Sequence, residues 1–529
     1  MHLGLNLAAG CKVAIDEMYG DWYRDPWGWP EFQWVSKNLA KVDVRALLRK
    51  DREEGYVLAN PAAFHLMEVP KNRLAVRPAV VQDSTSRLLY ATAVASNAQR
   101  LHSDLADWVF GWRARGGDSF VKNRVEWRSY IDRFDELEIS GLAGLHVDIA
   151  SCFASVDVDR LSEIVYGKLG KTAASGLIAD VIRRHDALTT RSGIPQRSFS
   201  SAALAHLYLQ PIDDALRVAD GSCLCVVRWM DDITVIGREE FLYGLYLNLQ
   251  DKAAQLGLTL NAAKSRLVDA DQVVSLVRDE DLKEIATSKV VDLAASKTGE
   301  GGYGAPVVVR DSGHLLELEE EYLADPGAFP RTKLRAVLTS LVRRQKFQRW
   351  LDWMNMAHRI PHVADALGRY LEKGADHGVP GRSGEPRWEL LQDFVVDFSQ
   401  REWGKVNWVM AQLALSVPAS KMGPHVIEMI RSWLADSDDV QKVAISAQRL
   451  AAERPADCRD IIRSRIDRIS DPVLLRIMAL GLVASNDERR LTRSILERDP
   501  RNSLVLSMLE DTNWKAPEVA KDFDVEDSD

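Results

Sequence analysis

The sequence predicts an α+β core followed by an all-helical domain, and three observations lead to that prediction. Between residues 70 and 270, short apolar runs of strand length alternate with segments of helical periodicity. A glycine-rich stretch at 296–304 then interrupts both patterns, and every segment beyond residue 330 has helical periodicity. With 529 residues and 46% apolar content, the chain is long enough for several packed domains.

Residues 1–69 are expected to form an aromatic-rich N-terminal extension. Pro26, Gly28 and Pro30 interrupt any regular element there. The aromatic residues between them are Trp22, Tyr23, Trp27, Trp29, Phe32 and Trp34. Tryptophans interleaved with proline are typical of a loop anchored on a neighbouring surface, and stacking of nucleobases on these rings is the alternative.

Residues 70–270 carry the alternating elements. Strands are expected at 74–81, 144–149, 223–229 and 233–236, and helices at 87–112, 159–185, 200–219 and 240–256. Residues 271–330, which contain the glycine-rich stretch, are expected to connect this core to the next domain.

Residues 331–515 are expected to form a helical thumb and an α-helical repeat domain. Val440, Val473 and Val505 follow similar Asp-containing entries and are spaced 33 and 32 residues apart. This spacing is typical of helical-hairpin repeats, so a HEAT-like stack is predicted. The acidic residues 516–529 are expected to be a disordered tail.

The net charge of −9 argues against nonspecific coating of nucleic acid, so local basic clusters are more informative. The stretch 331–349 contains arginines and lysines but no acid. We expect a thumb helix here, with Arg343 and Arg344 contacting a nucleic-acid backbone; a solvated helix face is the alternative. There is no apolar run of about 18 residues, and the five cysteines are scattered. We therefore expect a cytoplasmic protein with no membrane partner.

Three aspartates stand where predicted strands end. Asp148 follows the apolar run that begins at Gly144, and Asp231 and Asp232 lie between the two apolar runs of a predicted hairpin. Adjacent carboxylates at a buried turn repel each other unless cations compensate. Mg²⁺ is the natural compensating ion, because it combines a few carboxylates with substrate phosphates. An Asp pair taken alone is more typical of a hydrated turn than of an active site.

The order and spacing of the surrounding motifs resemble the palm of reverse transcriptases. Asp148–Phe153 is similar to the first catalytic motif, Gly193–Leu209 to the Pro-Gln motif, Trp229–Asp232 to the Tyr-x-Asp-Asp box and Leu256–Lys264 to the lysine-bearing motif. Upstream, Arg77–Leu89 resembles the fingers motif, in which an Arg-Pro strand leads into a helix. The resemblance implies a right-hand polymerase core of fingers and palm over residues 70–270. It also implies an RNA-directed DNA polymerase, which is a nucleotidyltransferase.

The resemblance further implies the roles of the catalytic residues. Asp148 and Asp231 would hold two Mg²⁺ ions, for which Mn²⁺ could substitute, with the carbonyl of Ile149 as a further ligand. Asp232 would be the supporting acid. Lys264 would approach the triphosphate and protonate the leaving pyrophosphate.

It also implies the substrate contacts. Phe153 would be the steric gate that excludes a ribose 2′-hydroxyl, and Gln196 would lie near the incoming base. Arg77 and Arg87 are candidates for triphosphate or template contacts.

Two residues depart from the family pattern. Trp229 replaces the usual tyrosine beneath the primer end. Arg197 replaces the glycine after Pro-Gln, where it would either grip a nucleic-acid phosphate or stand in place of a template.

A polymerase joined directly to helical repeats is similar to the bacterial abortive-infection and defence-associated reverse transcriptases. That resemblance implies synthesis of single-stranded DNA, templated by RNA or untemplated and protein-primed, in antiphage defence. The expected partners are deoxynucleoside triphosphates, RNA or single-stranded DNA, a cognate non-coding RNA and, through the repeats, further copies of the chain. Three alternatives stay open: a catalytically silent nucleic-acid-binding scaffold, an RNA-directed RNA polymerase, and a reverse transcriptase with a role outside defence.

Overall fold

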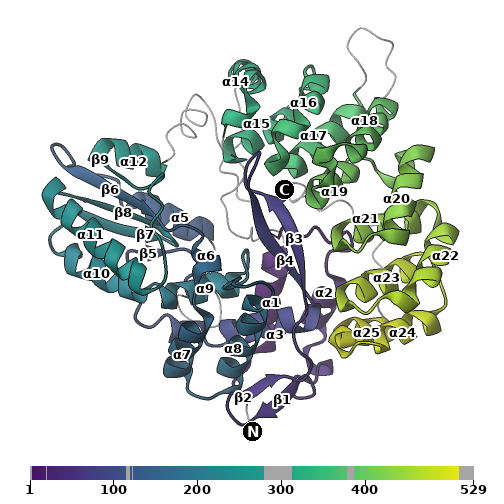
Figure 1. Cartoon of the computed structure of the whole chain (residues 1–529), viewed down its shortest axis with the longest axis horizontal. Coiled ribbons are helices and arrows are strands. Elements are labelled where there is room, and N and C mark those ends of the chain that lie inside the picture. The colour runs from purple at the N-terminus through teal and green to yellow at the C-terminus, as the bar shows by residue number, and fades with distance from the viewer. Residues whose placement is uncertain are drawn as a thin grey trace.

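The computed structural model describes residues 3–18, 21–114, 120–121, 123–278, 312–329, 331–377 and 387–511. Figure 1 shows one lobe built on a β-sheet and one lobe of stacked helices. The elements between the two lobes are α1 (Leu7–Met18), α2 (Pro30–Lys37), the hairpin of β3 (Phe64–Pro70) and β4 (Val76–Gln82), and α3 (Ser84–Ala95).

The sheet lobe contains five strands in the order β5-β7-β8-β6-β9. Their bounds are Val109–Phe110 (β5), Ala143–Asp148 (β6), Cys225–Trp229 (β7), Asp232–Gly237 (β8) and Arg266–Asp269 (β9). β5 runs parallel to β7, and the other neighbouring pairs are antiparallel. The strands expected at residues 144–149, 223–229 and 233–236 are therefore present and lie in one sheet.

Both faces of this sheet are buried, which explains why its strands are continuously apolar. Side chains of successive strand residues point to opposite faces: Val226 packs into one core, while Cys225 and Val227 pack into another. The helices that cover the two faces include α9 (Phe199–Tyr208), α10 (Gln210–Asp220) and α11 (Glu239–Gln255) in the first core, and α5 (Asn123–Asp132) and α12 (Ala270–Arg278) in the second.

Residues 158–220 form shorter helices than the periodicity predicts. The helix expected over 159–185 is two helices, α7 (Val158–Leu169) and α8 (Ala173–Asp186). Gly170 separates them with φ +69°, a conformation that glycine adopts without strain. The helix expected over 200–219 is likewise divided into α9 and α10, because Pro211 occupies the first turn of α10.

The prediction of one helix over 87–112 is also wrong in its second half. α3 ends at Ala95, the short α4 (Ala98–Leu101) follows, and Val109–Phe110 is the edge strand β5. Two residues are too few to show a strand period, so only pairing with β7 identifies them as a strand. By contrast, the strand expected at 74–81 is confirmed as β4, and the side chain of Asp83 caps the start of α3.

The N-terminal region, residues 1–69, contains more helices and strands than the irregular extension that the sequence predicts. Besides α1 and α2 it contains η1 (Leu39–Lys41) and a hairpin of β1 (Leu48–Asp51) and β2 (Gly55–Leu58). All six aromatic residues expected to anchor a loop are at most 7% exposed. They join one hydrophobic core with α3 and the helices beyond residue 312, which supports the anchoring interpretation over base stacking.

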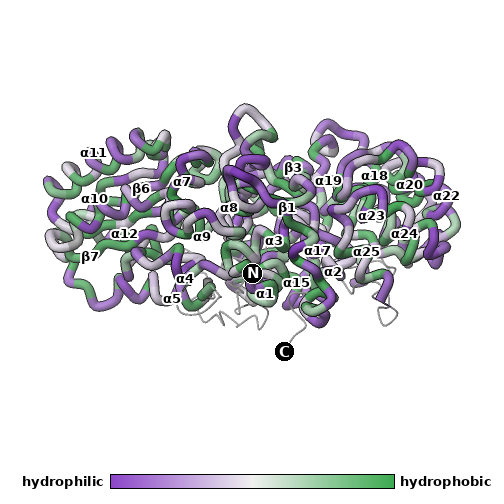
Figure 2. Tube along the Cα trace, turned by 90° about the horizontal axis from the view of Figure 1, so that it is seen from below, coloured by the Kyte–Doolittle hydropathy of each residue, from purple (hydrophilic) through white to green (hydrophobic). Residues whose placement is uncertain are grey.

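Beyond residue 330 every described element is helical, as expected, and α14 adds a helix within the stretch expected to be a connection. The larger helices are α14 (Ser312–Ala324), α15 (Arg331–Arg343), α16 (Trp350–Met356), α17 (Ala364–Ala375), α18 (Trp388–Gln400), α19 (Asn407–Leu415), α20 (Pro424–Asp436), α21 (Val440–Glu453), α22 (Pro455–Arg465), α23 (Pro472–Ala484), α24 (Arg489–Glu497) and α25 (Ser503–Glu510). Figure 2 shows hydrophobic and hydrophilic residues interspersed along them, the pattern of helices that bury one side. Val440, Val473 and Val505 are all buried.

The predicted boundary at residue 270 falls at the start of α12, which packs on β6 through Val273. The glycine-rich stretch and the acidic tail at 516–529 lie outside the described residues. Among the residues that the structure describes, no helix combines the length and the apolar character needed to cross a membrane.

Candidate active site

The palm sheet brings the three predicted aspartates to one end. In the register between β6 and β8, Asp148 is paired with Asp232. The pairing of Trp229 with Asp232 leaves Met230 and Asp231 as the two-residue turn of the β7–β8 hairpin. Met230 has φ +55°, and this left-handed conformation makes the tight turn possible. Residues separated by more than eighty positions in the chain are therefore neighbours.

The predicted lysine motif closes onto Asp148 from the opposite side. A bridge between Ile149 and Leu260, together with a hydrogen bond of 2.7 Å from the Asn261 amide to the Asp148 carbonyl, aligns the two segments. Lys264 Nζ then lies 2.6 Å from Asp148 Oδ1, and Asn261 Nδ2 donates to Asp148 Oδ2 over 2.7 Å. The prediction that Lys264 belongs with the aspartates agrees with this contact. Asn261 was not identified from the sequence, although its position three residues before the lysine, in a turn, was a usable signal.

The electrostatics of the aspartates favour a cation. Burial and the charge of Asp148 raise the pKa of Asp231. Burial, Asp231 and Asp148 raise the pKa of Asp232 to about 8. For Lys264, burial acts to lower the pKa, but the hydrogen bond to Asp148 and the three carboxylates raise it overall. Mutual repulsion among carboxylates is what a bound divalent cation relieves.

These residues fit the divalent ions that the sequence predicts. Carboxylate oxygens at the end of a sheet, next to the Ile149 carbonyl, are the hard ligands that Mg²⁺ prefers. In the described part of the chain, no three histidine, cysteine, aspartate or glutamate side chains are grouped closely enough to hold a metal ion by themselves. Both oxygens of Asp148 accept hydrogen bonds from Lys264 and Asn261 instead.

The predicted steric gate lies against the Pro-Gln segment. Phe153 is partly buried in α6 (Cys152–Ser155), and its carbonyl accepts a hydrogen bond of 3.0 Å from the amide of Ile194. Gly193 has φ +62°, and a Cβ added to it would lie 2.1 Å from the Phe153 carbonyl oxygen. Glycine is therefore required where this loop meets α6, and the loop carries Gln196, which is half-buried three residues later.

Trp229 is part of an aromatic cluster beside the turn. Its ring lies 4.9 Å from Trp127 and 5.6 Å from Tyr130, both on α5, and 6.3 Å from Trp112. Trp127 is 38% exposed, so the cluster reaches the surface. Three aromatic side chains from outside the hairpin thus support the residue that replaces the family's tyrosine.

The structure corrects the prediction that Arg87 contacts the triphosphate or template. Its side chain is buried, with Nη1 2.7 Å from Asp21 Oδ2 and Nε 3.4 Å from Glu17 Oε2. Glu17 in turn accepts hydrogen bonds from Ser198 Oγ and the Phe199 amide at the start of α9. A guanidinium in this position stabilises the packing of α1 on α3 and α9 rather than contacting a triphosphate directly.

Arg197, which is predicted to grip a nucleic-acid phosphate or to stand in place of a template, contacts an aromatic ring of the N-terminal region in this structure. Its Cζ lies 4.2 Å from the centre of the Trp22 ring, and Arg331 Cζ lies 4.6 Å from the same ring. The departure from the family's glycine therefore joins the Pro-Gln loop to the N-terminal region and α15 by cation–π contacts.

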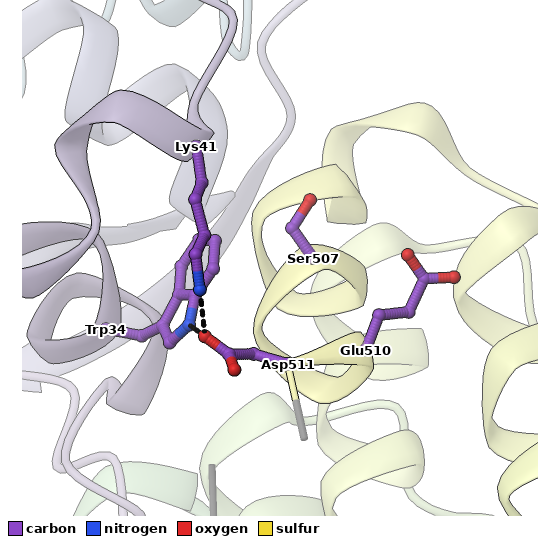
Figure 3. A pocket seen from close by; sticks show the side chains of 5 residues that line it. All are labelled: Trp34, Lys41, Ser507, Glu510 and Asp511. Atoms are coloured by element: carbon purple, nitrogen blue, oxygen red, sulfur yellow. Dashed lines mark hydrogen bonds and ion pairs between the residues drawn. The ribbon is translucent and has the colours of Figure 1, made fainter. Parts of the chain in front are cut away.

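The remaining predicted contact residues lie on other elements. Arg77 is half-buried on β4, opposite Val69 of β3. Arg343 ends α15, and Arg344 follows it; both are exposed. A separate hollow of about 340 Å³ lies between η1 and α25, where Trp34 Nε1 and Lys41 Nζ donate to Asp511 Oδ2 (Figure 3). None of the predicted site residues lines that hollow.

The solved structures that match this chain include two telomerases of low similarity. The structure of telomerase from Candida albicans in complex with a TWJ fragment of telomeric RNA is 13% identical, over 71% of this chain and 67% of that chain, with a TM-score of 0.29. Apo telomerase from Candida tropicalis is 10% identical over 81% and 70%, with a TM-score of 0.30. TM-scores this low support no conclusion about fold or role.

No curated protein matches the sequence. The family model described as reverse transcriptase (RNA-dependent DNA polymerase) matches residues 120–278, from the loop before α5 to the end of α12. Domains of this family use divalent metal ions, and they bind nucleotides and RNA or DNA templates. Because this segment contains Asp148, Asp231, Asp232 and Lys264 in the geometry described above, residues 120–278 form a reverse transcriptase domain, and the protein is a nucleotidyltransferase of the RNA-directed DNA polymerase class.

Proposed function

We propose that the chain synthesises single-stranded DNA from deoxynucleoside triphosphates, and that this synthesis serves antiphage defence by abortive infection. The observation that carries the catalytic part is the meeting of Asp148, Asp231 and Asp232 at one sheet end with Lys264 on Asp148. The defence part rests on the resemblance to polymerases that are fused to helical repeats.

In this proposal Asp148, Asp231 and the Ile149 carbonyl hold two Mg²⁺ ions, and Asp232 supports them. When bound, such ions stabilise the attacking and leaving oxygens of a phosphoryl transfer. The hydrogen bond to Asp148 and the neighbouring carboxylates keep the Lys264 ammonium protonated, because together they outweigh burial and raise its pKa. In this proposal that ammonium gives a proton to departing pyrophosphate.

The substrate side of the proposal uses three further residues. The ring of Phe153 excludes a ribose 2′-hydroxyl, and Gln196 orients the incoming base. Trp229, supported by its aromatic neighbours, supports the primer end. Two contacts support this arrangement. Arg197 attaches the Pro-Gln loop to Trp22, and Glu17 accepts a hydrogen bond from the Phe199 amide at the start of α9.

The catalytic proposal is tested with Asp231→Ala. Purified protein with Mg²⁺ or Mn²⁺, deoxynucleotides and the RNA that copurifies with it should make DNA. The substitution should lower the rate by about 10³-fold or more, since it removes a carboxylate that supports several kcal/mol of transition-state stabilisation. Asp269→Ala, at the exposed end of β9 in the same sheet, is the matched control and should retain activity. Synthesis that is insensitive to Asp231→Ala would refute the site.

Selection of deoxynucleotides is tested with Phe153→Ala. Shortening the side chain opens space for a 2′-hydroxyl, so ribonucleotide incorporation relative to deoxynucleotide incorporation should rise by about 10-fold or more. Phe153→Tyr keeps the ring and should keep the discrimination. A wild-type enzyme that already prefers ribonucleotides would support the RNA polymerase alternative instead.

The defence role is tested in cells by phage plating. Expression of the wild-type chain should reduce plaque formation, and Asp231→Ala should abolish that protection. Protection that survives Asp231→Ala would favour the alternative of a catalytically silent binding module. Sequencing of copurifying nucleic acid would show whether a cognate RNA, a DNA product and a protein-linked primer exist.

We also propose the domain assignment on which that resemblance depends. Residues 331–515 would be a helical thumb followed by a HEAT-like stack. The regular burial of Val440, Val473 and Val505 and the capping of α21 and α23 by Asp439 and Asp471 support a repeat. Such a stack offers surfaces for RNA or for further copies of the chain, and light scattering of the purified protein tests the latter.

A further inference from the structure

A buried polar network lies directly behind the turn that carries Asp231. Its centre is Arg228 on β7, which is fully buried. Arg228 Nε and Nη2 donate to the two carboxylate oxygens of Asp213 on α10 over 2.6 and 2.7 Å. Arg228 Nη1 donates to the carbonyl oxygen of Met230 over 2.6 Å. The arginine thus connects α10, which covers one face of the sheet, to the backbone of the catalytic turn.

His206 on α9 completes the orientation of this arginine. A guanidinium only donates hydrogen bonds, so His206 Nδ1, 3.2 Å from Arg228 Nη1, is the acceptor. Its Nε2 therefore carries the proton and donates to the Gly111 carbonyl over 2.6 Å. The ring is neutral in this arrangement, and burial and the charge of Arg228 lower its pKa well below the ordinary value.

The turn needs this support because its geometry is unfavourable for a side chain. Met230 adopts a left-handed φ of +55°, which residues other than glycine occupy only when their surroundings impose it. The Met230 amide donates to the Phe110 carbonyl over 3.4 Å. Gly111, with φ +88°, packs beside the Met230 side chain, since an added Cβ would be in ordinary contact with Met230 Cγ and Sδ at 3.4 Å. The Met230 amide therefore binds β5, outside the hairpin, whereas its carbonyl binds the Arg228 side chain on β7.

We propose that Arg228, oriented by Asp213 and His206, is the positioning residue of the catalytic turn. By holding the Met230 carbonyl it fixes the peptide plane between Met230 and Asp231, and through it the direction of the Asp231 carboxylate. A fully buried ion pair is seldom more stabilising than an apolar pair of similar volume. The arginine contributes geometry instead: its planar guanidinium binds Asp213 and the Met230 carbonyl at the same time, which a lysine ammonium does not reproduce.

The inference rests on the proposed DNA synthesis, so it is tested in the same assay by separating kcat from KM. Arg228→Lys keeps the charge but loses the simultaneous contacts to Asp213 and Met230. We expect kcat per folded molecule to fall by about 10-fold or more, with the deoxynucleotide KM changed by less than about threefold. Arg476→Lys is the matched control, because Arg476 is equally buried and binds both oxygens of Glu31. It lies on α23, and kcat per folded molecule should stay at the wild-type value.

A second variant covers the case in which Arg228→Lys does not fold. Arg228→Met combined with Asp213→Leu removes both charges and leaves no buried ion without its partner. It should fold, as judged by circular dichroism, and lose about 10²-fold in kcat. A folded double variant with wild-type kcat would overturn the proposal, as would an Arg228→Lys defect confined to KM or shared by Arg476→Lys. If the wild-type chain makes no product at all, it is the proposed function that fails.

Discussion

At the scale of single residues, the palm carries a concentration of negative charge that costs stability. Asp232 is paired with Asp148 in the sheet, its pKa is raised by burial and by the charges of Asp231 and Asp148 and lowered by that of Lys264, and His146 Nε2 lies 4.0 Å from its Oδ1. A carboxyl group whose pKa rises to about 8 on folding binds its proton more tightly in the folded state than in the unfolded state. The stability that this proton provides is complete below the unfolded pKa near 4 and is lost as pH rises through about 8.

We therefore predict that Asp232→Asn stabilises the metal-free protein while lowering its activity. In a chelating buffer its melting temperature should exceed that of the wild type by a few degrees at pH 8, and the difference should shrink toward pH 5. Added Mg²⁺ should also reduce the difference, because the ion neutralises the same carboxylates in the wild type. Differential scanning calorimetry at the two pH values measures this. A variant less stable than the wild type at pH 8 would contradict it.

At the scale of elements, the basic residues at the two ends of α15 have different surroundings. Arg331 and Arg335 face Asp365 of α17 and are partly buried, so this part of the cluster stabilises helix packing. Arg343 and Arg344 lie at the opposite end of α15 and are exposed. The structure therefore assigns Arg331 and Arg335 to ion pairs with Asp365 and leaves Arg343 and Arg344, the two residues predicted to contact nucleic acid, on the surface.

We predict that reversing Arg343 and Arg344 to Glu weakens binding of RNA or primer by about 10-fold at low salt and by much less at high salt, since released counterions drive such contacts. Fluorescence anisotropy at two salt concentrations measures the effect. Reversal of Arg489 and Arg490, an exposed pair on α24, changes the net charge equally and is the matched control. An equal loss at both salt concentrations would indicate a packing role for Arg343 and Arg344.

At the scale of the whole molecule, the N-terminal region joins the two lobes. Two arginines contact the Trp29 ring: Arg87 Cζ of α3 lies 5.2 Å from the ring centre, and Arg476 Cζ of α23 lies 4.4 Å from it. Arg476 also forms buried ion pairs with Asp25 and Glu31. Trp22 connects Arg197 to α19 through a hydrogen bond of 2.9 Å from Trp408 Nε1 to its carbonyl. The extension is thus an integral part of the core that the helical lobe shares with the fingers.

We predict that both lobes unfold in one transition and that Arg476→Met lowers its midpoint. Removing the guanidinium leaves two buried carboxylates uncompensated, which should cost about 3–5 kcal/mol in the free energy of unfolding. Urea denaturation followed by both tryptophan fluorescence and circular dichroism measures this. Two separate transitions, with only the later one affected, would contradict a shared core.

The sequence alone determined the central strands β6, β7 and β8, the helical C-terminal region and the three aspartates with Lys264. These are local signals, because apolar periodicity, caps and turns lie within a few residues of one another. Only the tertiary structure decided where Arg87 and Arg197 bind, since their acidic and aromatic partners are 66 or more positions away. The same holds for the edge strand β5 and for the network of Arg228, Asp213 and His206. A charged residue type predicts that a partner is needed, but which partner it finds depends on how distant elements pack.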